Sequence, residues 1–355
     1  QIGGRRNIII NGGMQVAQRS ASVTGLGAAS GYFTLDRFKM EINSASAGRF
    51  TMSQSAVTDL DGFSNALKID CTTADTSIAA GEVLILRQHI EGLNCQQLKA
   101  SSTSTNAFTL SFYAKSNASR AIASELRLSS GTNRQAVKVH TIGTSWARYT
   151  FTVAAASSTE IDNDNTTGLQ ANFFIHGGST FTGGTVSATL ESDTAANRAV
   201  GQVNASDSTS NNFEIAGVQM EVGTYTSSDL PPFRYESYGD NLLRCQRYFC
   251  MNQNSTQMTG SCNGSAQWNN ASIYCPVSMR STPTVSNFSG VNYWFDDGTA
   301  GADTSVSVAD IKHVANTNNI NFNINSMSGL TDNKMISGYV NTTSDSINVE
   351  WSAEL

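Results

Sequence analysis

The sequence has few charged side chains and no long apolar run. Charged residues make up 14% of its 355 residues, well below the share of about 25% in ordinary globular chains. The net charge of −6 argues against nucleic acid or an anionic membrane as a partner. No apolar run approaches the roughly 20 residues that span a bilayer. We therefore expect neither nucleic-acid binding nor membrane insertion.

The sequence also lacks the short motifs of catalysis. It has four histidines, none of them in an HExxH motif, and it contains neither a GxSxG nucleophile elbow nor a Walker loop. No repeat with a period of about 20–50 residues is visible, which argues against a solenoid or a parallel β-helix. We expect a protein that is not an enzyme and that needs no cofactor.

No pair of cysteines forms a CxxC motif. In a chain of this length we expect buried free thiols that behave as small apolar residues. A zinc site made by the last four cysteines is an alternative that their irregular spacing disfavours, and disulfides are a second alternative if the protein acts outside cells. The cysteines are Cys71, Cys95, Cys245, Cys250, Cys262 and Cys275.

Short segments of alternating apolar and polar residues dominate the chain. Such alternation is the period of a β-strand with one buried face. Many short strands with little helix predict an all-β protein, an antiparallel β-sandwich of the jelly-roll type. The alternation is clearest at 108–115, 147–153, 169–175 and 213–222, and further strands are predicted at 8–10, 33–40, 83–86, 126–128 and 186–190.

The stretch 213–251 closes this sandwich. The alternation slips by one residue at Ala216-Gly217, which predicts a β-bulge. Pro231 and Pro232 remove two ladder donors and end the sheet.

Residues 242–249 then change to a helical period. Ser237 or Asp240 is the expected cap of this short helix. The predicted organisation is a jelly-roll domain at 1–235, a helix and linker at 236–265, and a smaller C-terminal β-sandwich domain at 266–355.

Aromatic residues on outward faces are the candidate ligand-binding residues. Trp146 lies off the apolar face of its strand, and Tyr293 and Trp294 stand beside Asp296 and Asp297 in a turn-like stretch. Flat rings beside carboxylates are the chemistry of a sugar-binding surface. The alternative is structural: Trp146 packs under a loop, and residues 293–295 belong to a second core or a subunit interface.

Two acidic residues are candidate calcium ligands. Hard cations such as calcium bind clustered oxygens in loops, which makes Asp162 and Asp164 candidates. The remaining ligand pattern of an EF-hand is missing, and turn capping is the alternative role.

Several segments together resemble bacteriophage tail fibres and related virion fibre proteins. The similar segments are NIIINGGMQVAQRS at the start, TLDRF at 34–38, LRQHIEGLN at 86–94, FTLSFYAKS at 108–116 and FEIAGVQMEVG…YGDNLLRCQRYF between 213 and 249. Residues 275–285 (CPVSMRSTPTV) and the ending VEWSAEL resemble the small β domain that often follows.

This resemblance implies a carbohydrate-binding-module-like jelly roll followed by a distal β tip, in a homotrimer. We expect a virion structural protein, assembled in the host cytoplasm with other virion or tail proteins and extracellular in the mature particle. Its partner would be a host-surface glycan or protein. The alternative is a non-receptor virion component, such as a capsid decoration or a structural tail protein.

Overall fold

A computed structural model of the chain describes residues 6–43, 47–157, 159–252, 257–262, 267–286, 292–296, 301–305, 311–325, 335–341 and 349–355. Its contacts divide the chain into two compact units, Gln1–Asn241 with Leu355 and Leu242–Glu354. The protein is an all-β protein with short helices, as the sequence predicts. The finer division at residues 235 and 265 stays a prediction.

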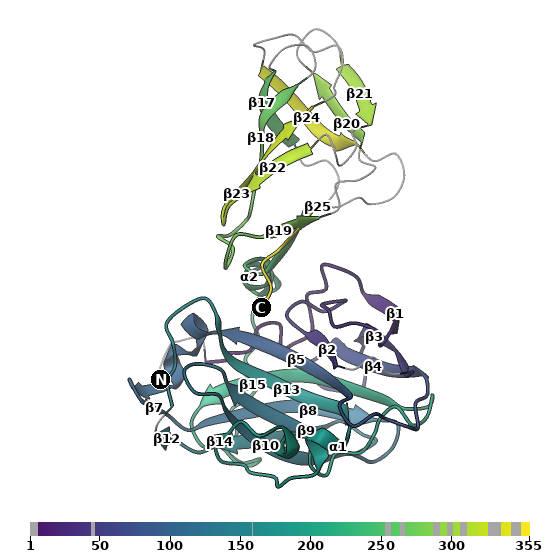
Figure 1. The fold of residues 1–355 in the computed structure, drawn as a ribbon, viewed down its shortest axis with the longest axis vertical. Helices are drawn as coiled ribbons and strands as arrows, with labels where there is room; N and C mark the ends of the chain where they lie inside the picture. Colours follow the sequence, from purple (N-terminus) through teal and green to yellow (C-terminus); the bar gives the residue numbers. More distant parts are fainter. Residues whose placement is uncertain are drawn as a thin grey trace. The chain divides into compact units, whose positions relative to one another are not determined.

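The first unit is a sandwich of two antiparallel sheets with six strands each. Sheet A has the order β1-β3-β4-β15-β8-β11, and sheet B has the order β14-β10-β9-β13-β5-β2. Figure 1 shows β5, β13, β9 and β10 of sheet B running side by side. Sheet A consists of β1 (Ser22–Leu26), β3 (Arg49–Ala56), β4 (Asn65–Thr73), β8 (Phe108–Ser116), β11 (Ala147–Val153) and β15 (Asn212–Val222). Sheet B consists of β2 (Lys39–Asn43), β5 (Val83–Glu91), β9 (Arg120–Leu128), β10 (Arg134–Ile142), β13 (Thr167–Gly177) and β14 (Glu191–Ser192).

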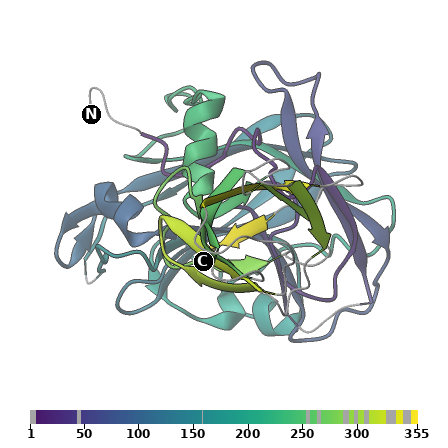
Figure 2. The same ribbon diagram turned by 90° about the horizontal axis from the view of Figure 1, so that it is seen from above.

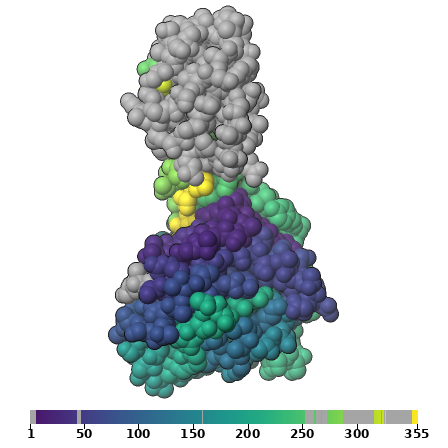
Figure 3. All heavy atoms as spheres, turned by 90° about the vertical axis from the view of Figure 1, so that its right-hand side faces the viewer, coloured from purple at the N-terminus to yellow at the C-terminus, as the bar shows by residue number. Residues whose placement is uncertain are grey.

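Short elements connect the strands of the sandwich. A small sheet joins β6 (Lys99–Ser101), β7 (Ser104–Thr105) and β12 (Ala156–Ser157). The helical pieces are η1 (Gly92–Leu98), α1 (Ser179–Thr182) and η2 (Ala195–Asn197). The face of this unit shown in Figure 3 carries purple and blue N-terminal segments beside teal and green segments from beyond residue 150. Strands distant in sequence therefore meet, as a sandwich requires.

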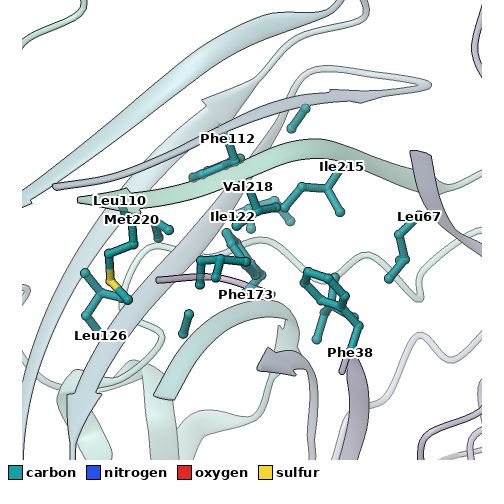
Figure 4. Close-up of a cluster of buried hydrophobic side chains, with 14 of the residues drawn as sticks. Phe38, Leu67, Leu110, Phe112, Ile122, Leu126, Phe173, Ile215, Val218 and Met220 are labelled. Carbon is teal, nitrogen blue, oxygen red and sulfur yellow. The ribbon is translucent and has the colours of Figure 1, made fainter. Parts of the chain in front are cut away.

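The core lies between the two sheets. Apolar residues of β8 and β15 in sheet A point toward those of β9 and β13 in sheet B (Figure 4). The alternation at 108–115, 147–153, 169–175 and 213–222 correctly predicted these strands, because each has one face in this core. The labelled residues are Phe38, Leu67, Leu110, Phe112, Ile122, Leu126, Phe173, Ile215, Val218 and Met220.

The predicted bulge is confirmed at Gly217. The pairing of β15 with β8 shifts register between Ala216 and Gln219, and Gly217 has a φ of +58°. A Cβ atom at Gly217 would come within 2.7 Å of the Phe63 ring and 2.8 Å of the Tyr113 ring. Only glycine fits here without strain or displacement of these rings.

After β15 the chain runs back over the outer face of sheet A as residues 223–236, which we call the belt. Outward side chains of the sheet bond to its backbone: Thr152 Oγ1 donates to Tyr225 O at 3.0 Å, and Arg148 Nη2 donates to Pro231 O at 2.9 Å. Gln219 accepts from Arg234 N at 2.7 Å through its side-chain oxygen. β15 ends at Val222, well before Pro231 and Pro232, so the prediction that these prolines end the sheet is wrong; they lie within the belt, which side chains hold on the sheet.

Residues 178–203 cover part of the outer face of sheet B. Phe181 of α1 and Ala199 pack with apolar residues of β5, β9, β10 and β13 in a second small cluster. Beside this cluster, Arg198 Nε and Nη2 donate to the two oxygens of the fully buried Glu125 carboxylate at 2.7 and 2.8 Å. The Arg198 guanidinium also lies 5.4 Å from the centre of the Phe174 ring.

Two predicted strands are wrong near the N-terminus. Residues 8–10 form no strand, although Ile8 N donates to Met220 O at 3.0 Å, because side chains hold the segment: Gln88 bonds both Ile10 N and Ile10 O at 2.9 Å. Residues 33–38 form turns, and β2 begins only at Lys39. Arg37 is fully buried with a φ of +72°, and its Nη2 donates to His89 O at 2.6 Å. In both segments, 8–10 and 33–38, polar contacts with residues distant in sequence determine the backbone conformation.

The predicted strand at 186–190 is also wrong. Residues 186–190 form no strand, the two-residue β14 follows at Glu191–Ser192, and Val186 is 39% exposed. Its alternating apolar residues therefore lack the continuous buried face that a strand pattern implies.

The second unit contains a seven-stranded antiparallel sheet, in the order β21-β20-β24-β17-β18-β23-β22, and a three-stranded sheet, β16-β25-β19. Trp351 of β25 is fully buried. The strands are β16 (Phe249–Asn252), β17 (Gln257–Cys262), β18 (Trp268–Tyr274), β19 (Thr284–Ser286), β20 (Asn292–Asp296), β21 (Gly301–Ser305), β22 (Ile311–Ala315), β23 (Asn319–Ile324), β24 (Met335–Asn341) and β25 (Val349–Ser352).

The predicted helix exists but is shifted toward the N-terminus. Helix α2 spans Tyr238–Gln246, drawn in green in Figure 2, and Phe249 already belongs to β16. Ser237 is its cap: its Oγ accepts from Asp240 N at 3.1 Å and donates to Asp240 Oδ2 at 2.8 Å. This reciprocal pair satisfies a backbone donor that the first turn leaves open.

The prediction of free thiols is confirmed where side chains are described. Cys71 and Cys95 are free and buried, Cys275 is free and half-buried, and Cys245 and Cys250 are buried. Burial raises the pKa of Cys275 to about 12. These sulfurs are unreactive thiols that pack as apolar groups.

Candidate functional site

The structure places Trp146 at the end of the outer face of sheet A, immediately before β11. Its ring is half-buried, and Nε1 donates to Asp59 Oδ1 at 2.9 Å. Lys115 Nζ lies 5.0 Å from the centre of the ring and 2.8 Å from Asp59 Oδ2. Asp59 belongs to the loop 57–64 between β3 and β4. Lys115 therefore contacts the face of the Trp146 ring, and the Asp59 carboxylate bonds its Nε1 edge.

Two hydrogen bonds keep the Asp59 carboxylate ionised. Donation from Lys115, and then from Trp146, lowers the pKa of Asp59 below its usual range. The carboxylate is ionised at neutral pH, and each oxygen has a defined partner. The orientation of the indole is thus fixed without a ligand, which reduces the entropy lost on binding.

A cluster of aromatic rings adjoins Trp146 on the same face. The ring centres of Phe63 and Tyr113 are 5.4 Å apart, and those of Phe63 and Phe233 are 5.0 Å apart. Tyr235 of the belt packs on Phe233 at 5.0 Å, edge to face, and remains 54% exposed. Such edge contacts hold rings rigidly. We call Trp146, Asp59, Lys115, Tyr113 and Tyr235 the Trp146 surface.

This arrangement suits a ligand with both apolar and hydroxyl groups. A sugar ring presents C–H groups to an aromatic plate and hydroxyl groups to charged partners at its rim. The sequence singled out Trp146 because it lies off the apolar face of its strand. It could not indicate Asp59 or Tyr235, because nothing local shows that Asp59 bonds Trp146 from 87 positions away or that Tyr235 packs on Phe63 and Phe233.

The other predicted sugar-binding residues belong to the second unit. Tyr293, Trp294 and Asp296 lie on β20, which pairs with β21 and β24. Asp297 lies outside the described residues. The expected turn-like stretch is thus a strand as far as Asp296.

The predicted calcium ligands stand in the loop before β13. Asp164 Oδ1 accepts from Thr166 N at 3.0 Å and from Thr166 Oγ1 at 2.8 Å, which is the turn-capping role. Asp162 accepts from Gln96 Nε2 through its backbone oxygen at 2.9 Å. Over the described ranges of the chain, no group of three or more His, Cys, Asp or Glu side chains is placed to hold a metal ion.

One buried constellation has the order of a nucleophile, a base and an acid, which sequence reasoning missed. His176 Nδ1 lies 2.5 Å from Ser206 Oγ, and its Nε2 lies 3.1 Å from Glu82 Oε1. Ser206 is 0% exposed and His176 1% exposed. Catalysis would need a substrate within reach of the hydroxyl, and this hydroxyl is enclosed. The contact fastens the loop at 206 to β13.

No protein-family model matches the sequence, and no curated protein gives a significant match. Solved structures that the chain is similar to include the enzymatically active domain of a tailspike protein of bacteriophage CBA120 (13% identity, TM-score 0.31, 61% of this chain and 21% of that chain). This chain thus spans about a fifth of the tailspike chain.

Two further similar structures are carbohydrate-binding modules. One is a family 61 module in complex with β-1,4-galactotriose (9% identity, TM-score 0.30, 62% of this chain and 100% of that chain). The other is a tandem of family 22 modules from Paenibacillus barcinonensis (8% identity, TM-score 0.26, 100% of both chains). TM-scores this low do not assign the chain to any of these groups.

Of the helices that the structure describes, none is both long and apolar enough to cross a membrane.

Proposed function

We propose that this protein is a non-catalytic virion protein, a trimeric phage tail fibre that binds a host-surface glycan through its β-sandwich. The resemblance of its sequence to virion fibre proteins supports the virion role. One observation carries glycan binding: the Trp146 surface holds an indole and an exposed tyrosine beside a fixed carboxylate and ammonium group. Ring plates beside oriented polar groups recognise sugars.

A glycan array probed with the labelled protein tests this function. We expect binding to a restricted set of glycans, and Trp146→Ala should weaken it by about tenfold or more, equivalent to about 1.4 kcal/mol, because the indole is the largest apolar contact. Tyr235→Ala should weaken it less. The matched control is Tyr274→Ala, which removes a 72% exposed tyrosine from β18.

Two outcomes would count against the proposal. Glycan binding that Trp146→Ala and Tyr235→Ala leave unchanged would remove the Trp146 surface as the site, provided that thermal unfolding shows both variants folded. Failure to bind any glycan or host cell, with the protein located on a capsid by electron microscopy of virions, would favour the non-receptor alternative. Light scattering tests the trimer, and a monomeric mass contradicts it.

A further inference from the structure

A pocket lies on the outer face of sheet A, at the far end of that face from Trp146. It has a volume of about 180 Å³. Glu221 of β15 pairs with Thr109 of β8, and Lys115, the partner of Trp146, is six residues farther along β8. At about 3.4 Å per strand residue the two places are about 20 Å apart. The pocket is lined by Arg6, Gln97, Asn106, Glu221, Val222 and Tyr225.

The carboxylate of Glu221 is the central polar group of this pocket. Its side chain is 5% exposed, and Oε1 accepts from Gln219 Nε2 at 2.7 Å. Oε2 lies 3.9 Å from Arg6 Nη1, which is beyond hydrogen-bond distance. A ligand hydroxyl could therefore donate to Oε2 without displacing a bonded partner.

Tyr225 forms the aromatic wall of the pocket, and contacts of its backbone hold it in place. Gly223 has a φ of +125°, and a Cβ atom there would come within 2.9 Å of the Tyr225 ring. Tyr225 N donates to Thr109 Oγ1 at 3.2 Å, and Tyr225 O accepts from Thr152 Oγ1 at 3.0 Å. The glycine lets the ring lie against the chain, and the threonines fix its position.

The charges around the pocket indicate a neutral ligand. Burial raises the pKa of Glu221 above its ordinary value, while the guanidinium groups of Arg6, Arg148 and Arg234 oppose that rise. An anionic ligand would meet the Glu221 carboxylate, and a cationic ligand would meet these guanidinium groups. A ligand with many hydroxyl groups can donate to the carboxylate and accept from Arg6 and the side-chain amide of Gln97; the amide nitrogen of Asn106 already donates to Gln97 O and Lys99 O, so its oxygen is the group it offers a ligand.

The volume limits the size of the ligand. Pockets for drug-sized molecules span about 300–1,000 Å³, so a pocket of about 180 Å³ suits a single ring. We propose that the Glu221 pocket binds a single neutral sugar residue, with Glu221 and Arg6 bonding adjacent hydroxyl groups and Tyr225 covering one face of the ring. This inference deepens the proposed function and rests on it for the source of the sugar, a host glycan.

Saturation-transfer NMR with methyl glucoside, methyl galactoside, methyl mannoside and N-acetylglucosamine tests the inference, with N-acetylneuraminate as the anionic probe. We expect transfer to at least one neutral sugar at millimolar concentration. Glu221→Gln, which keeps the shape of the side chain, should weaken binding by about tenfold, since it removes a charge-assisted bond. Tyr225→Ala should weaken binding independently. Asp70→Asn on β4 is the control and should change nothing.

Three results would overturn the inference. They are no transfer to any neutral sugar, transfer that Glu221→Gln and Tyr225→Ala both leave unchanged, and N-acetylneuraminate binding more tightly than every neutral sugar. Trp146→Ala separates this test from that of the proposed function. A monosaccharide signal retained in that variant, with no glycan recognised on the array by the unmodified chain, would contradict the proposed function and leave the pocket standing.

Discussion

The two outer faces of the sandwich are closed in different ways. On sheet A, outward side chains bond to the backbone of the belt, and the aromatic rings of the Trp146 surface stay reachable. On sheet B, outward side chains bond to one another beneath residues 178–203. The face that satisfies its polar groups with backbone leaves side chains available for a ligand, whereas the other face uses them for stability.

On the outer face of sheet B, a row of polar side chains bond one another. Arg87, Asn172 and Glu125 are neighbours across β5, β13 and β9. Arg87 Nε donates to Asn172 Oδ1 at 2.8 Å, and Asn172 Nδ2 donates to Glu125 Oε2 at 2.6 Å. With Arg198 above it, the carboxylate of Glu125 has partners on both oxygens. A buried charge is tolerable only when it is paired in this way.

Glu125→Ala should have the largest effect, because it breaks this row at its centre. Removing one partner of a buried ion pair leaves the other charge uncompensated, and such changes cost about 3–5 kcal/mol. Urea unfolding should show this loss. The control is Asp59→Asn, which alters an exposed carboxylate of the loop 57–64 beside sheet A and should leave the midpoint almost unchanged. Equal urea midpoints for both variants would show that the carboxylates of the two faces contribute equally to stability.

Gly217→Ala should have the next largest effect, on sheet A. The left-handed backbone costs a residue with a Cβ about 1–2 kcal/mol, and overpacking against Phe63 and Tyr113 costs about 1–3 kcal/mol more. Gly25→Ala separates the two terms, since Gly25 has a φ of +75° with nothing within 4 Å of a Cβ. The melting temperature of Gly217→Ala should be well below that of Gly25→Ala. The same decrease in both variants would rule out a contribution from the clash with the Phe63 and Tyr113 rings.

These residues show how far the sequence predicts the fold. Period-2 alternation located β8, β11, β13 and β15 because one face of each lies in a single core. It located the bulge, because Gly217 stands where the period slips. It failed at 33–38, where Arg37 is turned inward by a bond to His89 O, 52 positions away. Contacts of that range leave no periodic signal.

The candidate sites follow the same rule. Trp146 was found because its own strand shows which way it points. Asp59, Tyr235 and Glu221 were missed because their roles depend on partners that the fold brings from other segments. The strand predicted at 126–128 begins after Glu125, and the sequence gives no sign that residues 178–203 bury the outer face on which Glu125 lies.

Acid should weaken the contact between the two sheets through His140. This histidine of β10 lies against Phe112 of β8, with ring centres 5.2 Å apart. Burial, and then the charge of Lys138, lowers the pKa of His140 to about 4. In the unfolded chain it titrates near 6.5. The unfolded state therefore binds the proton first as the pH falls.

The stability that neutral His140 contributes is fully present above pH ~6.5 and is lost as the pH falls toward ~4, by about 2–3 kcal/mol. Urea unfolding from pH 7 to 4 measures this loss. His140→Phe keeps the aromatic contact and should show a smaller loss over that range. If both proteins lose the same amount, His140 does not cause the pH dependence.

Gln219→Ala should have the smallest effect on stability and should act mainly on the belt, although it also removes the hydrogen-bond partner of Glu221 Oε1. The amide of Gln219 is buried and bonds the belt twice, from Arg234 N at 2.7 Å and to Pro232 O at 3.3 Å. Losing these bonds should cost about 1–2 kcal/mol, and belt amides, Arg234 above all, should then exchange their hydrogens about tenfold faster. Gln54→Ala is the control, since Gln54 bonds Met14 O at 2.8 Å and does not touch the belt. If belt amides still exchange slowly in Gln219→Ala, the packing of Phe233 holds the belt without these hydrogen bonds. The outer face of sheet A would then be covered through side-chain packing, as that of sheet B is, and the two faces would not differ in the way proposed.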